Sequence, residues 1–166
     1  MQKQYIPYII FLFLILVFCS LIFTAPYTTY LAEEKPGYGT ISKLNYNFFH
    51  PICHQKPERS FFIFGYKLGV CARCTGIYVG MLILTILYQL FKRIDDNSTP
   101  SKYYLIASLI PMGLDGGTQL LGIRESFNEL RFITGFMFGG ILIFYLLPVF
   151  NQLVWGLVDT LKNKFL

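Results

Sequence analysis

The chain has 166 residues, of which 54% are hydrophobic, 18% aromatic and only 14% charged, and its mean hydropathy is +0.51. Soluble domains carry about 25% charged residues, so this composition excludes an ordinary soluble globular protein and predicts a protein embedded in a membrane. The net charge of +5 suits anionic lipid headgroups and gives no reason to expect a nucleic-acid partner.

Four apolar stretches are long enough to cross a bilayer, whose hydrocarbon core takes about 20 helical residues. Backbone polar groups in lipid must be satisfied within their own segment, which favours helices over open sheets. We therefore expect an all-α membrane protein: a four-transmembrane-helix bundle in a single integral membrane domain over 1–166. The predicted helices cover about 5–24, 75–91, 103–123 and 132–149.

Both ends of the chain allow a second interpretation. Residues 5–24 end on the small-residue sequence Thr24-Ala25-Pro26, which is typical of a cleaved signal peptide, but their apolar core is about twice the usual signal length and favours a retained anchor. The tail, 151–166, mixes apolar residues with Asp159 and two lysines. That pattern predicts either a helix lying in the membrane interface or the end of the fourth helix.

Orientation follows from the charges that flank the helices. Lys92 and Arg93, after the second predicted helix, form a typical cytoplasmic flank, so we expect a multi-pass protein of the cell membrane with both termini inside. The loop of about 26–74 then lies outside the cytoplasm. A simple count of cationic residues, six inside against eight outside, argues for the opposite orientation.

The loop before the second helix is expected to be irregular at first and then to form a hairpin. Residues 26–49 are punctuated by Pro and Gly and show no helical periodicity, which predicts a loop. Residues 60–64 and 67–70 are typical of two short β-strands around a tight turn at Gly65-Tyr66. Such a hairpin would carry Cys71 and Cys74 back towards Cys53.

Three of the four cysteines and both histidines lie in one 25-residue stretch of this loop, from His50 to Cys74. The spacing of His50, Cys53, Cys71 and Cys74 fits a tetrahedral Cys3His zinc site, with His54 as an alternative to His50. The fourth cysteine, Cys19, lies in an apolar run and is expected to be a packed side chain.

Two other interpretations of the cysteines remain open. Outside the cytoplasm, Cys53 would form a disulfide with Cys71 or Cys74 and staple the loop of a structural membrane protein. A redox pair of Cys71 and Cys74 would have its thiolate stabilised by Arg73. In the metal interpretation, Arg73 and Arg59 would instead offset the formal negative charge of the loaded site.

A second polar cluster is expected around the end of the third helix. Asp115 and Gln119 are one helical turn apart and share a face. A carboxylate in a membrane span costs about 2.5 to 3.5 kcal/mol, so Asp115 is expected to have a counter-ion, Arg124 or Arg131, or a chemical task. Its plainest role is an ion pair that holds the third and fourth helices together.

The loop before the second helix and the turn after the third open on the same membrane face, so the two clusters are expected to meet in one polar pocket. The pocket would bind an anion, such as an anionic lipid or a lipid-linked or phosphorylated substrate. An envelope enzyme would use His54 or Asp115 as its base. Loop arginines that simply pair with nearby glutamates are the alternative. The candidate anion-binding residues are Arg59, Arg73, Gln119, Arg124, Asn128 and Arg131.

Glycines predict close packing between two helices. Gly76 and Gly80 in the second predicted helix, and Gly135, Gly139 and Gly140 in the fourth, form strips that let another helix approach closely. We expect these helices to pack on each other, or across a homo-oligomer.

The cysteine segments resemble a family of small, uncharacterised predicted membrane proteins of bacteria and archaea. The family motifs Cys-His-Gln-x-Pro-x-Arg-Ser-Phe and Cys-Ala-Arg-Cys-Thr-Gly-Ile-Tyr-x-Gly correspond here to 53–61 and 71–80, and the resemblance extends through Asp115 to Gly135. It implies a membrane module of unknown function and supplies no reaction. The second half is also faintly similar to VanZ-like membrane proteins, through Asp115, Gln119, a turn arginine and the glycines of the fourth helix.

Overall fold

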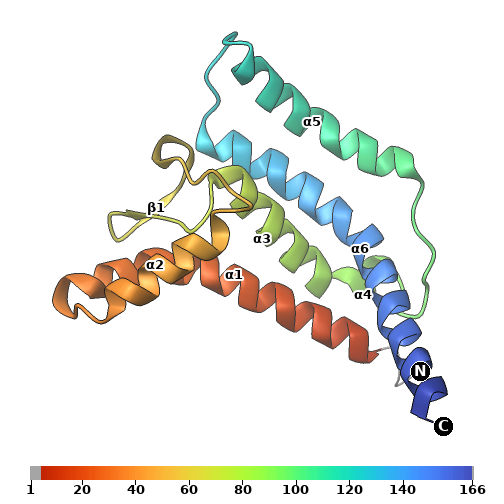
Figure 1. The fold of residues 1–166 in the computed structure, drawn as a ribbon. Helices are drawn as coiled ribbons and strands as arrows, with labels where there is room; N and C mark the ends of the chain where they lie inside the picture. Colours follow the sequence, from red (N-terminus) through yellow and green to blue (C-terminus); the bar gives the residue numbers. More distant parts are fainter. Residues whose placement is uncertain (1–4, 166) are drawn as a thin grey trace.

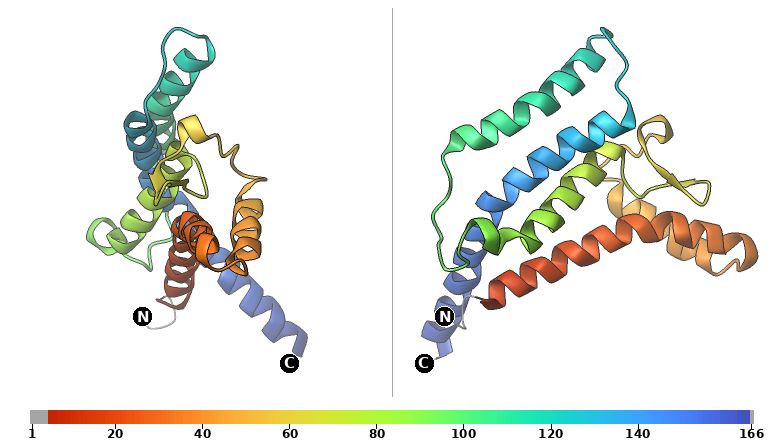
Figure 2. Two further views of the ribbon diagram at one scale, coloured as in Figure 1. Left: turned by 90° about the vertical axis from the view of Figure 1, so that its left-hand side faces the viewer. Right: turned by 180° about the vertical axis from the view of Figure 1, so that it is seen from behind.

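The computed structural model describes residues 5–165, with side chains described as far as Lys162. Four helices run alongside one another in a bundle, and α1 begins at the same end of the bundle at which α6 ends (Figures 1 and 2). The short helix α4 (Tyr88–Phe91) directly follows α3. The bundle helices are α1 (Tyr5–Glu34), α3 (Ala72–Ile86), α5 (Lys102–Leu120) and α6 (Asn128–Phe165).

The expectation of an all-α membrane protein is confirmed at the level of its helices. Among the described residues, α1 and α6 are each long and apolar enough to cross a membrane, and α3 is apolar but has only 15 residues. Two of the four expected spans, those in α1 and α6, therefore have the length and the apolar composition that a membrane-spanning helix requires. The expected C-terminal segment is helical as a continuation of α6, and Leu166 lies outside the described residues.

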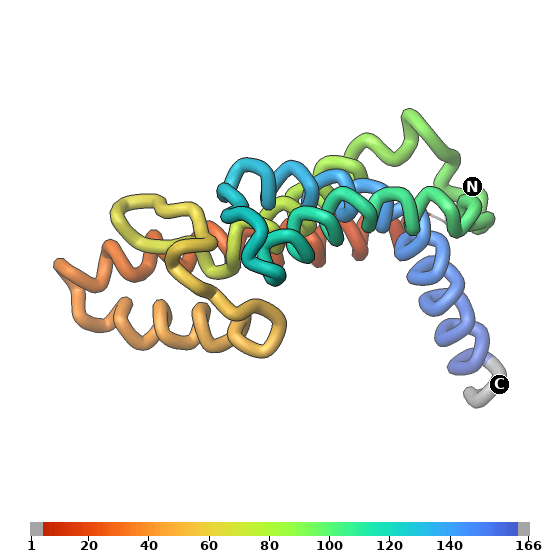
Figure 3. The backbone as a smooth tube through the Cα atoms, turned by 90° about the horizontal axis from the view of Figure 1, so that it is seen from above, coloured from red at the N-terminus to blue at the C-terminus, as the bar shows by residue number. Residues whose placement is uncertain are grey.

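The expected loop at 26–49 is wrong, because α1 continues to Glu34 and a second helix, α2 (Tyr38–Phe49), folds back along it (Figures 1 and 3). Pro26 lies inside α1 and has no N–H for the carbonyl of Ile22. The backbone N–H of Gly69 donates to that carbonyl instead, at 3.1 Å. A contact from a distant part of the chain thus satisfies the group that proline leaves free.

Helix α2 turns its polar side towards α1. The hydroxyls of Thr29 and Ser42 are 2.6 Å apart, and the Asn45 side chain donates to Thr24 Oγ1 at 3.0 Å. Ile41 and Leu44, by contrast, are exposed. Ser42 and Asn45 therefore belong to the buried face of a helix. Because that face is partly polar, the helix lacks the apolar periodicity by which an amphipathic helix is recognised in a sequence.

Helices α3 and α6 pack through their glycines. A Cβ added at Gly76 or Gly80 would collide with the backbone of α6, and one at Gly135 or Gly139 would collide with the backbone of α3. Side chains that carry a Cβ would hold these backbones apart, so the glycines are required for the close approach. The expected packing of these two helices on each other occurs within one chain.

The predicted hairpin is present but short. Strands β1 (Phe62–Ile63) and β2 (Tyr66–Lys67) are antiparallel, with Ile63 paired to Tyr66. The turn is one residue earlier than expected, at Phe64 and Gly65, and both have positive φ angles, of 55° and 80°. Two successive positive φ angles are typical of the type I′ turn that suits a two-residue hairpin.

Candidate metal centre and the adjoining ion-pair cluster

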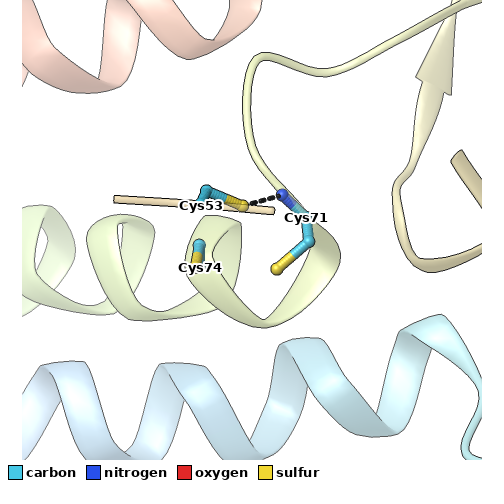
Figure 4. Close-up of side chains that lie close together, drawn as sticks. All are labelled: Cys53, Cys71 and Cys74. Atoms are coloured by element: carbon cyan, nitrogen blue, oxygen red, sulfur yellow. Dashed lines mark hydrogen bonds between the residues drawn. The ribbon is translucent and has the colours of Figure 1, made fainter. Parts of the chain in front are cut away.

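Three cysteine sulfur atoms converge where the hairpin segment joins α3. The Sγ atoms of Cys53, Cys71 and Cys74 all lie within 4.8 Å of one another (Figure 4). Cys53 follows α2, Cys71 caps the N-terminus of α3 and Cys74 lies in its first turn. The first two are buried and the third is half-buried. The convergence of separate segments that the spacing predicted is therefore present.

Backbone and side-chain contacts fix the two segments that carry these sulfurs. The side-chain amide of Gln55 donates to the carbonyls of Tyr46 and Gly69, at 2.8 and 2.9 Å. It thereby ties the Cys53 turn to α2 and to the segment between β2 and Cys71. Gln55 has a φ angle of 48°, a conformation that few residues other than glycine adopt. Sequence reasoning gave Gln55 no role, although it belongs to the Cys-His-Gln motif.

The surroundings of Cys53 favour its thiolate. The Cys53 sulfur accepts hydrogen bonds from the backbone N–H groups of Cys71 and Gln55, at 3.1 and 3.5 Å, and it lies beside the thiols of Cys71 and Cys74. The neighbouring thiols and these N–H groups hold the pKa of the Cys53 thiol well below its usual range, against the opposing effect of burial. A thiolate is the form that binds a metal ion.

The arrangement of the sulfurs is compatible with a bound metal ion. All four cysteines are free, Cys19 among them, buried in α1 as expected. Zinc–sulfur bonds of about 2.3 Å in tetrahedral geometry place neighbouring sulfurs about 3.8 Å apart, which falls within the 4.8 Å limit. The three cysteines are therefore close enough to hold one ion.

The two histidines are not part of this group. His50 and His54 are both exposed, and His54 Nδ1 accepts a hydrogen bond from the backbone N–H of Lys56 at 3.2 Å. Among the described residues, the metal-binding group therefore consists of three cysteines without the imidazole that the spacing suggested. Sequence proximity to Cys53 does not direct either ring towards the sulfurs.

Asp115, buried with 2% of its side chain exposed, is the centre of the neighbouring polar cluster. Its Oδ1 accepts from the Arg124 guanidinium at 2.9 Å and from the Ser126 hydroxyl at 2.6 Å. Its Oδ2 accepts from the guanidinium of Arg73, and Gly116, which has no side chain, leaves room for that group beside α5. Arg124 was an expected counter-ion; Arg73 and Ser126 were not assigned to the carboxylate.

Arg131, the other expected counter-ion, has different contacts. Its Nη1 donates to the side-chain carbonyl of Asn128 at 2.7 Å, and Asn128 donates to the backbone carbonyl of Ser60 at 3.1 Å. Arg131 is 5% exposed, and its Nε is buried without a hydrogen-bond partner. Gln119, on the same helix as Asp115, is half-buried and is not among the side chains that bond to the carboxylate.

Arg73 joins the two clusters. It lies between Cys71 and Cys74 in sequence, and its guanidinium reaches Asp115 on α5. The segment that supplies two of the three sulfurs is thus also bonded to the buried carboxylate. The expected meeting of the cysteine and Asp/Arg clusters is therefore present in the fold, through the Arg73–Asp115 ion pair.

Fold and site together define an all-α membrane protein with a tri-cysteine cluster next to a buried carboxylate. The chain belongs to the DUF2085 family, described as "Predicted membrane protein", whose model matches residues 53–145 and so includes both clusters. No solved structure matches the chain.

Two archaeal relatives are themselves uncharacterised. The chain is 53% identical over 154 residues to the uncharacterized protein MJ1492 of Methanocaldococcus jannaschii, covering 93% of this chain and 97% of the relative. It is 46% identical over 89 residues to an uncharacterized protein of Methanothermobacter thermautotrophicus, covering 52% of this chain and 77% of the relative. The expected resemblance to a family of small predicted membrane proteins is confirmed.

Proposed function

We propose that this protein is a four-span protein of the cell membrane in which Cys53, Cys71 and Cys74 bind one zinc ion. The ion would fasten the extramembrane segment between α1 and α3 onto the N-terminus of α3. The single observation that carries the proposal is the convergence of three sulfurs from two separate segments within 4.8 Å. Thiolate-rich zinc sites contribute directly to folding, so the proposed role of the metal is structural.

A tetrahedral zinc ion needs one more ligand than the three cysteines supply. Water, or the imidazole of His54 or His50 after a movement of the exposed ring, would fill that position. A site that keeps water there has the open coordination of catalytic zinc centres, and this supports a second candidate, an envelope enzyme acting on a lipid-linked or phosphorylated substrate.

The contacts of Asp115 favour the structural role over the enzymatic one. A general base needs a free oxygen within reach of the proton that it removes. Both oxygens of Asp115 already accept hydrogen bonds, from Arg73 on one side and from Arg124 and Ser126 on the other. We therefore propose that Asp115 is a counter-ion, which leaves a metal-bound water or His54 as the base of any reaction.

Elemental analysis of the purified protein, combined with counting of free thiols after denaturation, tests the zinc proposal. We expect about one zinc per chain and four free thiols, because zinc binds thiolates without oxidising them. The single variants Cys53→Ser, Cys71→Ser and Cys74→Ser should each lose the metal, whereas the matched control Cys19→Ser should retain it. Protein without metal that carries one disulfide would overturn the proposal in favour of a stapled loop.

The two histidines can be tested in the same assay. If an imidazole supplies the fourth ligand, His54→Ala or His50→Ala should lower zinc affinity, by about 10-fold or more, whereas neither variant should matter if the ligand is water. Either result leaves the three-cysteine site intact and decides whether its fourth position is closed or open.

A further inference from the structure

The four arginines at this end of the bundle differ in whether they have a carboxylate partner. Arg73 and Arg124 are both bound to Asp115. Among the described residues, no carboxylate oxygen lies within 4.0 Å of Arg59 or Arg131. Two of the four guanidinium groups are therefore used in the ion-pair cluster and two are not.

Arg131 is buried without a carboxylate partner, which is unusual for a cation. It is 5% exposed and its Nε has no hydrogen-bond partner. The charges of Arg59 and Arg73 repel it, and the charge of Asp115 attracts it. It also lies in the first turn of the 38-residue helix α6, where the helix dipole places partial positive charge and disfavours a cation. A buried charge without a partner costs several kcal/mol, so the fold leaves a strong demand for a negative charge at this position.

Arg59 is held next to Arg131 by the hairpin segment. The residue after Arg59, Ser60, accepts a hydrogen bond from Asn128, which in turn binds Arg131. The following residue, Phe61, packs edge-on against Phe132 of α6 with ring centroids 6.0 Å apart. Arg59 itself is half-buried and is thus open to a ligand from one side.

Charge balance defines the class of ligand. A zinc ion with three thiolates would carry one net negative charge and Asp115 carries another, against four guanidinium groups, so within the two clusters two positive charges stay without a buried counter-charge. The neighbouring carboxylates Glu58, Glu125 and Glu129 are exposed, and none of them forms an ion pair with these arginines. A phosphomonoester carries about −1.5 to −2 at neutral pH and offers three acceptor oxygens. Guanidinium groups match such an oxyanion through paired N–H donors.

We propose that Arg131 and Arg59, at the first turn of α6, form a binding site for a phosphate group, supplied either by a lipid headgroup or by a free phosphate. The site rests on the proposed function in one respect, since Arg59 lies in the segment that the zinc ion would fasten. It is distinct from the Asp115 cluster, whose arginines are already paired.

Binding of inorganic phosphate to the detergent-solubilised protein, at constant ionic strength, tests the free-phosphate arm. Retention of phosphatidic acid, whose headgroup is a phosphomonoester, tests the lipid arm; it is measured by native mass spectrometry after release from nanodiscs of phosphatidylcholine and phosphatidic acid. Loss of one charged hydrogen-bond donor should weaken binding by roughly 10-fold or more. We expect Arg59→Gln and Arg131→Gln each to weaken binding by this factor in one of the two assays, phosphate binding or lipid retention.

The matched control is Lys43→Gln, which removes an exposed cation from α2 and should leave binding unchanged. Arg59→Gln keeps the test decisive if Arg131→Gln does not fold, because Arg59 is only half-buried. Saturable phosphate binding or lipid retention that both arginine variants lose, and Lys43→Gln keeps, supports the site. If wild-type protein shows neither, or if the arginine variants match Lys43→Gln, the site is excluded.

Zinc content is measured on the same samples. Full zinc with no phosphate binding would overturn the phosphate site alone. Phosphate binding by a protein without zinc would overturn the proposed function and leave the phosphate site standing.

Discussion

At the residue scale, Asp115 shows how one buried carboxylate is kept charged. Donors reach it from the start of α3 and from the turn before α6, which supplies both Arg124 and Ser126, so with α5 itself three chain segments meet at a single group. A charge buried in this way is stable only while its partners stay in place. The carboxylate is therefore expected to hold the helices together more than to perform chemistry.

The variant Asp115→Asn should be strongly destabilising. It removes the negative charge and leaves the guanidinium groups of Arg73 and Arg124 near a buried amide. Loss of one partner of a buried ion pair costs about 3–5 kcal/mol, and the partial exposure of the two arginines favours the lower end of that range. Thermal unfolding in detergent measures the effect. The control Asp95→Asn, which breaks an exposed pair with Arg93, should change the midpoint little, and equal effects of the two variants would contradict the proposed role.

The lowered pKa of Cys53 has a consequence for the metal-free protein. A thiol whose pKa falls on folding stabilises the folded state fully above its ordinary pKa of about 9, and this stabilisation is lost as the pH falls through the lowered pKa of the folded state. Metal-free protein should therefore carry a thiolate at neutral pH, visible in its ultraviolet absorbance. Cys53→Ser should abolish that absorbance and Cys19→Ser should keep it. Wild-type protein that forms thiolate only in alkali would refute the prediction.

At the scale of elements, the α3–α6 pair is the most closely packed part of the bundle. Glycines on both helices let the backbones touch, and this contact sets the position of the first turn of α3, which carries Cys71, Arg73 and Cys74. Helix α5 is attached more loosely: only Ser108 and Asp115 of this helix are fully buried. The ion pair of Arg73 with Asp115 is thus a principal link between α5 and α3.

A single added methyl group should disturb the helix pair. In Gly139→Ala, the new Cβ would collide with the backbone of Ile77, and backbone cannot move aside as a flexible side chain can. We expect a loss of about 1–3 kcal/mol, measured by thermal unfolding in detergent. Gly156→Ala, in the same helix with open space around it, is the control and should be neutral or slightly stabilising. A neutral Gly139→Ala would show that the two helices are not in backbone contact.

At the scale of the whole molecule, the placement of the clusters depends on topology. The bundle puts the beginning of α3, the end of α5 and the beginning of α6 at one end, and the beginning of α1 and the end of α6 at the other (Figure 2). If all four helices cross the bilayer, the sulfurs and the Asp115 cluster lie at a single membrane face.

Labelling in sealed vesicles tests the four-span arrangement. Lys43→Cys lies on α2, near the clusters, and Thr99→Cys lies in the connection between α4 and α5, and both positions are exposed. A membrane-impermeant maleimide should label one of them in intact vesicles and the other only after permeabilisation, in each case above the labelling of the wild-type chain, whose own four cysteines are the background. Labelling of both from the same side would exclude four crossings. The side on which Lys43→Cys reacts also decides whether the cysteine segment is extracytoplasmic.

The sequence by itself determined the class of protein and the convergence of the cysteines. Both depend on local properties. Apolar composition predicts helices in a membrane, and a short hairpin reverses the chain direction between Cys53 and Cys71, so that the two cysteines can approach each other. The glycines at 76 and 139 likewise predicted a helix pair, because spacing along one helix fixes which residues share a face.

Only the tertiary structure decided which arginines pair with Asp115. It also decided that both imidazoles stay outside the sulfur group, and that 38–49 is a helix with its polar side facing α1. Each of these depends on distances between segments far apart in the chain. Arg73 is 42 residues from Asp115, whereas Arg131, only 16 residues away, bonds to Asn128 instead. A charge pairs with whatever the packing of helices brings within hydrogen-bond distance, and spacing along the chain does not encode that packing.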